Sequence, residues 1–165
     1  MTIKLKKITL NDVNSKYLNW LKDKEVFYYS DQSKIKQTIN KIKKYVKDRL
    51  DGNEKMYGIF YKKNHIGNIK LGPIDYINLS SEISYFIGEK NLWNKGLATK
   101  AIIEIIKIAK KKGIKKLIAA CQAPNLGSIK VLKKNKFLKE GLLKKHQILG
   151  NKKKRTDVFI YGKIL

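Results

Sequence analysis

Hydrophobic and polar positions alternate in patterns that divide the chain into short strands and amphipathic helices. Strict alternation predicts a first strand over residues 4–9, and two runs with strand character, residues 56–61 and 66–71, predict a hairpin around a turn at residues 63–65. Apolar residues at helical spacing predict helices over residues 13–21, behind an Asn11-Asp12 cap, and 33–49. The second helix would bury the stripe Ile35, Ile39, Ile42 and Val46.

The region of residues 83–110 contains a strand that leads through a glycine-containing turn into a long helix. Its apolar run 83–87 follows a turn at residues 75–80, and the helix begins at Gly96. Unpaired amides and the positive end of the helix dipole predict an anion site at this helix start. Gly96 removes a side chain there, Ala98 is small, and Lys95 adds a cation. By spacing alone, Gly96 equally fits a simple strand-to-helix turn.

The helix ends at Lys112-Gly113, and a short apolar strand at residues 116–121 follows it. A crossover of this kind predicts that this strand runs parallel to the strand at 83–87. Two last strands are predicted at residues 138–150 and 156–164, with a polar turn between them. This order of elements predicts an α/β (α+β) fold, and we expect residues 1–165 to form a single domain.

Composition limits the class of protein further. The chain has 165 residues, of which 42% are hydrophobic, and its single cysteine, Cys121, excludes an internal disulfide framework. No apolar run is long enough to cross a membrane, and the first residues lack the apolar region of a signal peptide. We therefore expect a cytoplasmic protein without a membrane partner. With only His65 and His146 beside the one cysteine, no metal site is expected.

The net charge of +25 raises the alternative of a non-enzymatic basic module that binds RNA or DNA. Against this alternative, Arg49 and Arg155 are the only arginines, although nucleic-acid recognition relies on the planar arginine fork. The lysines are also spread along the whole chain. A specific nucleic-acid partner is therefore not expected, and the alternative predicts lysines gathered on one face.

Two motifs resemble those of the GNAT superfamily, the acetyl-coenzyme A-dependent N-acetyltransferases. The segment WNKGLA at residues 93–98 is similar to the pyrophosphate loop Gln/Arg-x-x-Gly-x-Gly/Ala, with Trp93 in place of Gln or Arg. That departure resembles the branch of the ribosomal-protein N-terminal acetyltransferases. About 30 residues downstream, a second segment is similar to N-x-x-[SA]-x-x-x-[YL]-x-K-x-G-F-x-x-E-G, with Lys136 in place of the first Gly. Its matching residues are Asn125, Ser128, Leu132, Lys134, Phe137, Glu140 and Gly141.

The resemblance implies a mixed, mostly antiparallel sheet of six to seven strands with a central splayed parallel pair, flanked by about four helices. It also implies acetyl-coenzyme A as the co-substrate, without a metal, and a monomer or homodimer. The pantetheine arm would pair with backbone groups in the gap between the splayed strands. The residues expected to bind coenzyme A are Phe86, Ile87, Gly88, Trp93, Asn94, Lys95, Gly96, Leu97, Ala98, Thr99, Asn125, Ser128 and Lys134.

Acetyl transfer to an amine needs a proton acceptor and profits from a donor near the sulfur. Glu82, which precedes the strand at 83–87, is the first candidate for the base, and a solvated surface glutamate is the alternative. Many members of the family carry a tyrosine donor where this chain has Leu132. Either Ser128 replaces it or the thiolate leaves unassisted, while Tyr85 and Tyr161 remain as other donors. Cys121 is expected to be a buried structural thiol.

The acceptor is a primary amine whose identity stays open between three classes. These are a protein α-amine, an amino group on a nucleotide-linked sugar, and a polyamine or aminoglycoside. The positive surface disfavours the polycations, because like charges repel. We expect Tyr29, Asp31 and Asp157 to contact the acceptor, and the two aspartates are also lesser candidates for the base.

Overall fold

Seven strands form one sheet in the computed structural model, which describes residues 2–149 and 154–165. In chain order the strands are β1 (Ile3–Lys7), β2 (Lys55–Tyr61), β3 (Asn64–Asp75), β4 (Ser80–Ile87), β5 (Lys116–Gln122), β6 (Leu138–Ile148) and β7 (Arg155–Ile164). Their spatial order is β1-β2-β3-β4-β5-β7-β6, and every neighbouring pair is antiparallel except β4 and β5. The expected mixed sheet with one parallel pair is confirmed.

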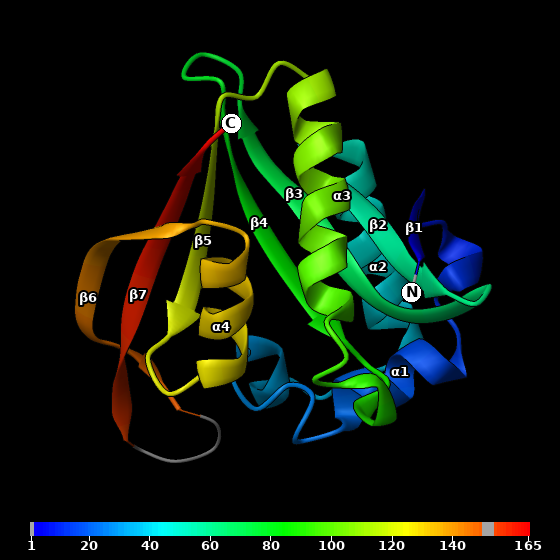
Figure 1. Cartoon of the computed structure of the whole chain (residues 1–165). Helices are drawn as coiled ribbons and strands as arrows, with labels where there is room; N and C mark the ends of the chain where they lie inside the picture. Colours follow the sequence, from blue (N-terminus) through cyan, green and yellow to red (C-terminus); the bar gives the residue numbers. More distant parts are fainter. Residues whose placement is uncertain (1, 150–153) are drawn as a thin grey trace.

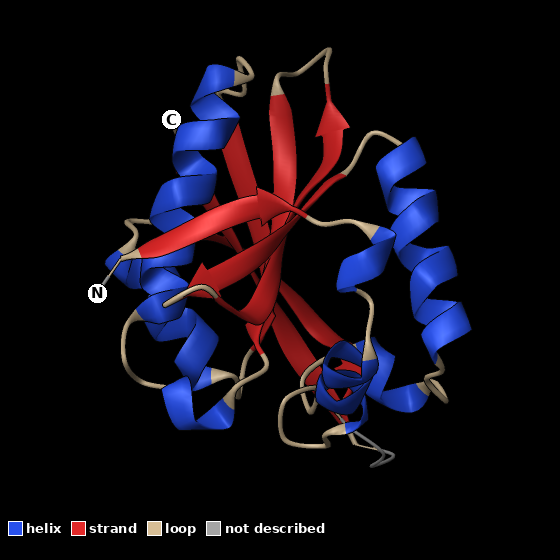
Figure 2. Ribbon diagram, turned by 90° about the vertical axis from the view of Figure 1, so that its right-hand side faces the viewer, coloured by secondary structure: helices blue, strands red, loops and turns tan. Residues whose placement is uncertain are grey.

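Helices cover both faces of this sheet (Figures 1 and 2). They are α1 (Ser15–Lys22), α2 (Ile39–Asp51), α3 (Leu97–Lys111) and α4 (Leu126–Lys134), with short 3-10 turns at Leu10–Asp12, Asp31–Lys34 and Lys90–Leu92. Helices α3 and α4 lie on one face, and α1 and α2 lie on the other (Figure 1). The apolar stripe of each helix faces the sheet because burial of that stripe is what stabilises an amphipathic helix.

The parallel strands β4 and β5 are paired only at their beginnings. Three residue pairs connect them, and the last joins Glu82 with Ile118. Beyond this point the two strands diverge, while β5 keeps its other neighbour β7 along its whole length (Figure 1). The sheet is therefore split from its middle to one edge, with the beginnings of α3 and α4 on either side of the gap.

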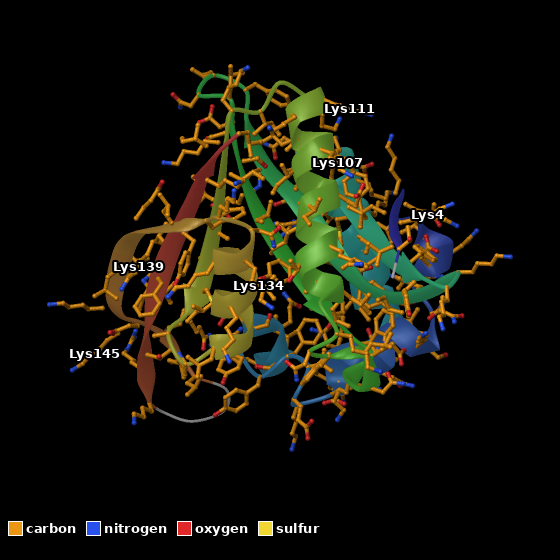
Figure 3. The ribbon with its side chains drawn as sticks, viewed as in Figure 1. Lys4, Lys107, Lys111, Lys134, Lys139 and Lys145 are labelled. Carbon is orange, nitrogen blue, oxygen red and sulfur yellow. The ribbon has the colours of Figure 1, made fainter. Side chains whose placement is uncertain are left out.

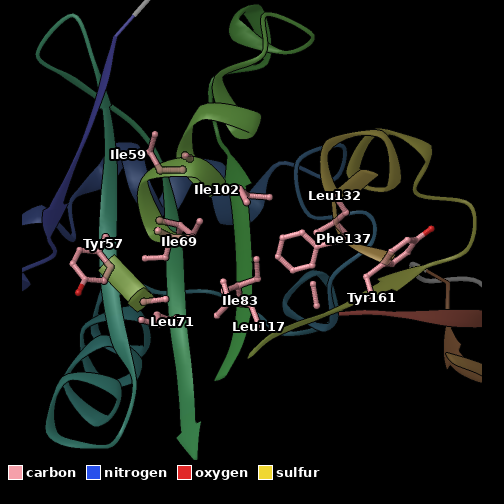
Figure 4. Packing of buried hydrophobic residues seen from close by; sticks show 14 of the residues in the cluster. Tyr57, Ile59, Ile69, Leu71, Ile83, Ile102, Leu117, Leu132, Phe137 and Tyr161 are labelled. Atoms are coloured by element: carbon pink, nitrogen blue, oxygen red, sulfur yellow. The ribbon is translucent and has the colours of Figure 1, made fainter. Parts of the chain in front are cut away.

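Two buried clusters stabilise the two layers. The larger one packs α3 and α4 on the sheet, where Ile69 and Leu71 of β3 and Ile102 of α3 are completely buried (Figure 4). The smaller one packs α1 and α2 on the opposite face and contains Trp20 and Val46. Full burial of such a side chain contributes about 2 kcal/mol, so both helix layers are firmly held.

The first two helices begin later than their sequence pattern predicts. The side chain of Asn14, not Asn11 or Asp12, caps α1 by accepting a hydrogen bond from the Tyr17 amide. Helix α2 begins at Ile39 behind a Thr38 cap, because residues 31–34 form a separate 3-10 turn. Ile35 consequently lies outside α2 and is 49% exposed. Only Ile42 and Val46 of the predicted stripe are fully buried, with Ile39 half-buried beside them.

Most of the predicted polar turn between β6 and β7 lies outside the described residues, since these exclude residues 150–153. Within the described part of the chain, no helix is both long and apolar enough to cross a membrane.

Candidate active site

A cavity of about 710 Å³ opens where β4 and β5 separate. One part of its wall comes from the end of β4 and from the beginnings of α3 and α4. The opposite part comes from the loop before α2, from α2 itself and from the face of β2 and β3 that α2 covers. The cavity therefore runs through the split in the sheet and reaches both faces.

The beginning of α3 forms part of this wall through Asn94, Gly96, Leu97 and Ala98. Gly96 is the N-cap residue of α3 and has a left-handed conformation, with φ 74°. Because glycine has no side chain, it cannot cap the first amides of the helix. A Cβ atom at Gly96 would meet no atom within 4 Å, so the conformation and not crowding favours glycine there. The first amides of a helix have no partner within it, so this turn offers donors to an anion in the cavity. Lys95 and Thr99 belong to the same turn but do not line the cavity.

Trp93 ties the loop before α3 to the end of β4. Its indole Nε1 donates a 2.8 Å hydrogen bond to the carbonyl oxygen of Ile87. The side chain is 37% exposed and lines the cavity. Trp93 thus holds the loop against β4, which is a structural reason for a long aromatic donor at this position.

Along β4 the backbone N–H and C=O groups of successive residues point alternately toward its two neighbours. On one side the Leu79 carbonyl accepts from Lys115 beside β5, at 2.7 Å, and on the other the Gly88 amide donates to Ile66 of β3, at 2.8 Å. By this alternation the backbone N–H and C=O groups of Tyr85 and the N–H of Ile87 face the gap, while those of Phe86 and Gly88 face β3. Contact of Phe86 and Gly88 with the coenzyme stays a prediction. The Phe86 side chain still lines the cavity.

The beginning of α4 brings a hydroxyl pair into the cavity. Asn125 caps α4 by accepting a hydrogen bond from the Ser128 amide at 3.1 Å, and Ser128 Oγ lies 2.8 Å from the Tyr85 hydroxyl. Burial raises the pKa of Tyr85, which keeps its phenol protonated and able to donate. The sequence left Tyr85 open as one of several donors, and the structure shows which hydroxyl it meets.

Leu132 and Tyr161 are separated from this hydroxyl pair. Leu132 is 1% exposed and packs in the larger core cluster, so its place on α4 faces the sheet. Tyr161 is also buried in that cluster. Cys121 is buried, and burial raises the pKa of its thiol, so the expectation of a structural thiol is confirmed. None of these three side chains lines the cavity.

Glu82 lies at the point where β4 and β5 separate. It is exposed and stands on the face of β4 that also carries Ser84 and Phe86, both of which line the cavity. Glu82 itself borders a neighbouring depression together with Asn53 and Asp75. Its role as the base stays a prediction. Glu82 precedes by two positions Ser84, the first residue of β4 that lines the cavity.

The other predicted polar residues are divided between the cavity and the surface. Tyr29 lines the cavity, and its hydroxyl donates to the Pro124 carbonyl at 3.2 Å. Asp31 pairs with Lys34 at 2.6 Å, and Asp157 accepts from the Lys145 amide at 2.7 Å, both outside the cavity wall. Lys134 is exposed in the last turn of α4, also outside the wall. The two aspartates therefore have structural partners, and their contact with the acceptor stays a prediction.

The side of the cavity away from α3 contains polar residues that the sequence pattern did not single out. Asn68 and Lys70 of β3 and Ser84 of β4 line it between apolar side chains. Their signal was present as polar positions within strands that are otherwise apolar. Among the described residues, no group of histidine, cysteine, aspartate or glutamate side chains could hold a metal ion.

Comparison with known proteins gives consistent matches. The family model described as acetyltransferase (GNAT) domain matches residues 2–138. The chain is similar to the ribosomal-protein-serine acetyltransferase of Escherichia coli (strain K12), with 29% identity over 115 residues, or 69% of this chain and 63% of that protein. It is also similar to the uncharacterized N-acetyltransferase p20 of Bacillus licheniformis, with 30% identity over 116 residues, or 68% of this chain and 64% of that protein. The chain thus matches somewhat less than two thirds of each relative's length.

A solved structure shows the same fold over the whole chain. It is RimL, a ribosomal L7/L12 alpha-N-protein acetyltransferase in complex with coenzyme A, and it superimposes with a TM-score of 0.88. The superposition covers 100% of this chain and 95% of that one, at 20% sequence identity.

Proposed function

The chain belongs to the acetyltransferase (GNAT) domain family, and we propose that it transfers the acetyl group of acetyl-coenzyme A to a primary amine. The observation that carries the proposal is the position of the α3 amides, which open onto a cavity that continues into the gap between β4 and β5. A diphosphate fits the helix start, and an extended pantetheine arm fits the unpaired edge of β4.

The residues around the starts of α3 and α4 would act in sequence along the coenzyme. The amides at Leu97 and Ala98 would bind the diphosphate, and the N–H and C=O groups of Tyr85 and the N–H of Ile87, whose carbonyl accepts from Trp93, would pair with the pantetheine amides. Asn125 would contact the arm with the part of its amide that does not cap α4. Lys95, Thr99 and Lys134, which lie outside the cavity wall, would contribute positive charge or polar contacts at its margin.

The chemistry would be direct attack of the neutral amine on the thioester carbonyl. The nitrogen forms a bond to the carbonyl carbon, the carbon–sulfur bond breaks, and the amine proton passes to a base. The Ser128 hydroxyl would donate a hydrogen bond to the departing thiolate, and Tyr85 would in turn donate to Ser128 Oγ. Glu82 is proposed as the base, with its proton carried over the short separation by water.

The acceptor is proposed to be a protein α-amine or an amino group on a nucleotide-linked sugar. The similarity to a ribosomal-protein-serine acetyltransferase supports the first. A polyamine fits poorly, because Glu25 is the one acidic residue among the described residues that line the cavity. Glu25 is itself paired with Lys90 at 3.1 Å. A chain of ammonium groups would therefore find few carboxylates to replace its water.

The alternative of a basic module that binds nucleic acid predicts lysines gathered on one face. Figure 3 shows the opposite for the labelled lysines, which project from different parts of the molecule. Lys4 lies on β1 and Lys139 on β6, which are the two opposite edges of the sheet. Such a distribution favours general solubility and attraction of anionic ligands over one nucleic-acid groove.

The test is a panel of amines assayed for release of free thiol from acetyl-coenzyme A, with mass spectrometry of the product. The panel would contain N-terminal peptides, nucleotide-linked amino sugars and polyamines. We expect transfer to at least one peptide or amino sugar, and Glu82→Gln should slow it at saturating cofactor. Glu104→Gln on the exposed side of α3 is the matched control. Absence of transfer to every amine, with no binding of acetyl-coenzyme A, would contradict the proposal.

A further inference from the structure

A polar patch lies on the cavity wall away from α3. Asn68 and Lys70 lie two positions apart on β3, so their side chains stand on the same face of the sheet. Ser84 of β4 is the register partner of Lys70. All three line the cavity beside the apolar side chains of Met56 and Phe86. The patch thus offers hydrogen-bond donors within an apolar wall.

The patch carries a net positive charge. Lys70 Nζ lies 2.7 Å from Glu54 Oε1, and the other carboxylate oxygen of Glu54 lies 2.5 Å from Arg49 Nε. Two cations therefore share one carboxylate, and Glu54 is not part of the cavity wall. An ammonium has three N–H donors, of which the contact with Glu54 uses one. The Lys70 side chain is only 17% exposed, so its charge is weakly screened by water.

Asn68 adds an unsatisfied donor to the same place. It is 3% exposed, and its Oδ1 accepts a 2.7 Å hydrogen bond from His65 Nε2. Within the described part of the chain, its buried Nδ2 has no acceptor at full hydrogen-bonding geometry, and the Tyr17 hydroxyl is the polar group that interacts with this amide. A buried amide hydrogen without a partner is unfavourable, so an acceptor atom delivered by a ligand would relieve it. A cation beside a free donor is the arrangement that binds a carboxylate or phosphate.

We propose that Lys70, Asn68 and Ser84 form an oxyanion subsite, and that the amine acceptor carries a carboxylate or phosphate close to its amino group. This inference rests on the proposed acetyl transfer. Asn68 is the register partner of Phe86. Phe86 lies between Tyr85 and Ile87, whose backbone groups face the gap between β4 and β5. Since a strand rises about 3.3 Å per residue, the subsite lies within roughly 10 Å of the acetyl group. The anionic group and the amine are therefore expected on the same small molecule or on neighbouring residues of one peptide.

The subsite is tested by calorimetric binding of two matched probe pairs to the intact protein saturated with coenzyme A. The first pair is a C-terminally amidated peptide beginning Ser-Asp and its Ser-Asn counterpart, which differ in one charge. The second pair is O-phosphoethanolamine and ethanolamine. We expect the anionic member of at least one pair to bind roughly 10- to 100-fold more tightly than its neutral counterpart. The pair with the larger ratio identifies a side-chain carboxylate or a phosphate as the source of the oxyanion.

Variants separate the subsite from general charge. Lys70→Met should abolish the preference for the anionic probe, and Lys70→Arg should retain part of it. Lys70→Met also removes the net positive charge of the group formed by Lys70, Glu54 and Arg49. The double variant Lys70→Met and Glu54→Gln restores that net charge without the lysine and should likewise lack the preference. The control Lys110→Met removes an exposed lysine near the end of α3 and should keep the wild-type preference.

Equal binding of charged and neutral probes by the wild-type protein would overturn the subsite, as would a preference that survives Lys70→Met. The readout is binding, so it does not depend on acetyl transfer. Charge-dependent binding without any acetylation would support the subsite and contradict the proposed reaction.

Discussion

Substitution of two matched glycines separates the role of Gly96 in folding from its role in binding. Gly96 and Gly113 flank the same helix α3, with φ values of 74° and 78°, and a Cβ atom at either position would meet no atom within 4 Å. Alanine at each position therefore has the same cost, that of a left-handed conformation, about 1 kcal/mol. For a domain of this size, we expect both variants to lower the melting temperature by about 2–4 °C.

Of these two glycines, Gly96 lines the cavity and Gly113 does not. Gly96→Ala should therefore weaken the binding of acetyl-coenzyme A, and Gly113→Ala should not. We expect a methyl group there to hinder the approach of a phosphate to the first amides of α3. Loss of one charge-assisted hydrogen bond costs about 1.5–3 kcal/mol, which corresponds to a dissociation constant roughly 10- to 100-fold higher. Gly96→Glu should bind still more weakly by charge repulsion, and Gly113→Glu should bind like wild type. Calorimetric titration of the four variants measures this, and equal dissociation constants for Gly96→Ala and Gly113→Ala would refute the reasoning.

Three further predictions concern buried side chains. Tyr85→Phe removes the hydrogen bond to Ser128 and should lower kcat about 10-fold while the affinity for acetyl-coenzyme A stays unchanged, and an unchanged kcat would contradict the role of this pair. Leu132→Ala should lower the free energy of unfolding in urea by about 2–5 kcal/mol, because Leu132 is 1% exposed in the core. Burial raises the pKa of Tyr17 above its ordinary value of 10.0. The folded state therefore holds this proton more tightly than the unfolded state. The contribution of Tyr17 to the free energy of unfolding is fully present below about pH 10 and is lost as the pH rises further. Tyr17→Phe should lose less stability than wild type between about pH 9 and about pH 11, and parallel losses would exclude Tyr17 as the cause.

The starts of α3 and α4, where coenzyme binding is predicted, could be predicted because their signals are local. The left-handed cap at Gly96 and the Asn125 cap of α4 depend on residues within one helical turn. The same is true of the alternation that makes β4 a strand. The mixed sheet with one parallel pair then follows from the crossover through α3. The GNAT fold expected from the two motifs is confirmed by the sheet order and by the structural match to RimL.

The surroundings of the polar residues away from α3 were less predictable, because they depend on contacts between residues that are distant in the sequence. The sequence does not show the partner of Asp157. The pairing of β6 with β7 is irregular near Lys145, and there the Lys145 amide donates a hydrogen bond to the Asp157 carboxylate. Lys70 appears as one lysine among many until Glu54, 16 positions earlier, is seen beside it. Helix α2 begins later than predicted because Ser30 caps a separate 3-10 turn and Thr38 caps the helix itself. The pattern of apolar residues does not indicate which of the two caps begins the helix.

The central claim is that the beginning of α3 binds the diphosphate of an acetyl-coenzyme A held between β4 and β5. The most direct measurement is a calorimetric titration of the wild-type protein with acetyl-coenzyme A, repeated with Gly96→Glu. The account predicts one binding site per chain in the wild-type protein and a large loss of affinity in the variant. Failure of the wild-type protein to bind, or undiminished binding by Gly96→Glu, would contradict it.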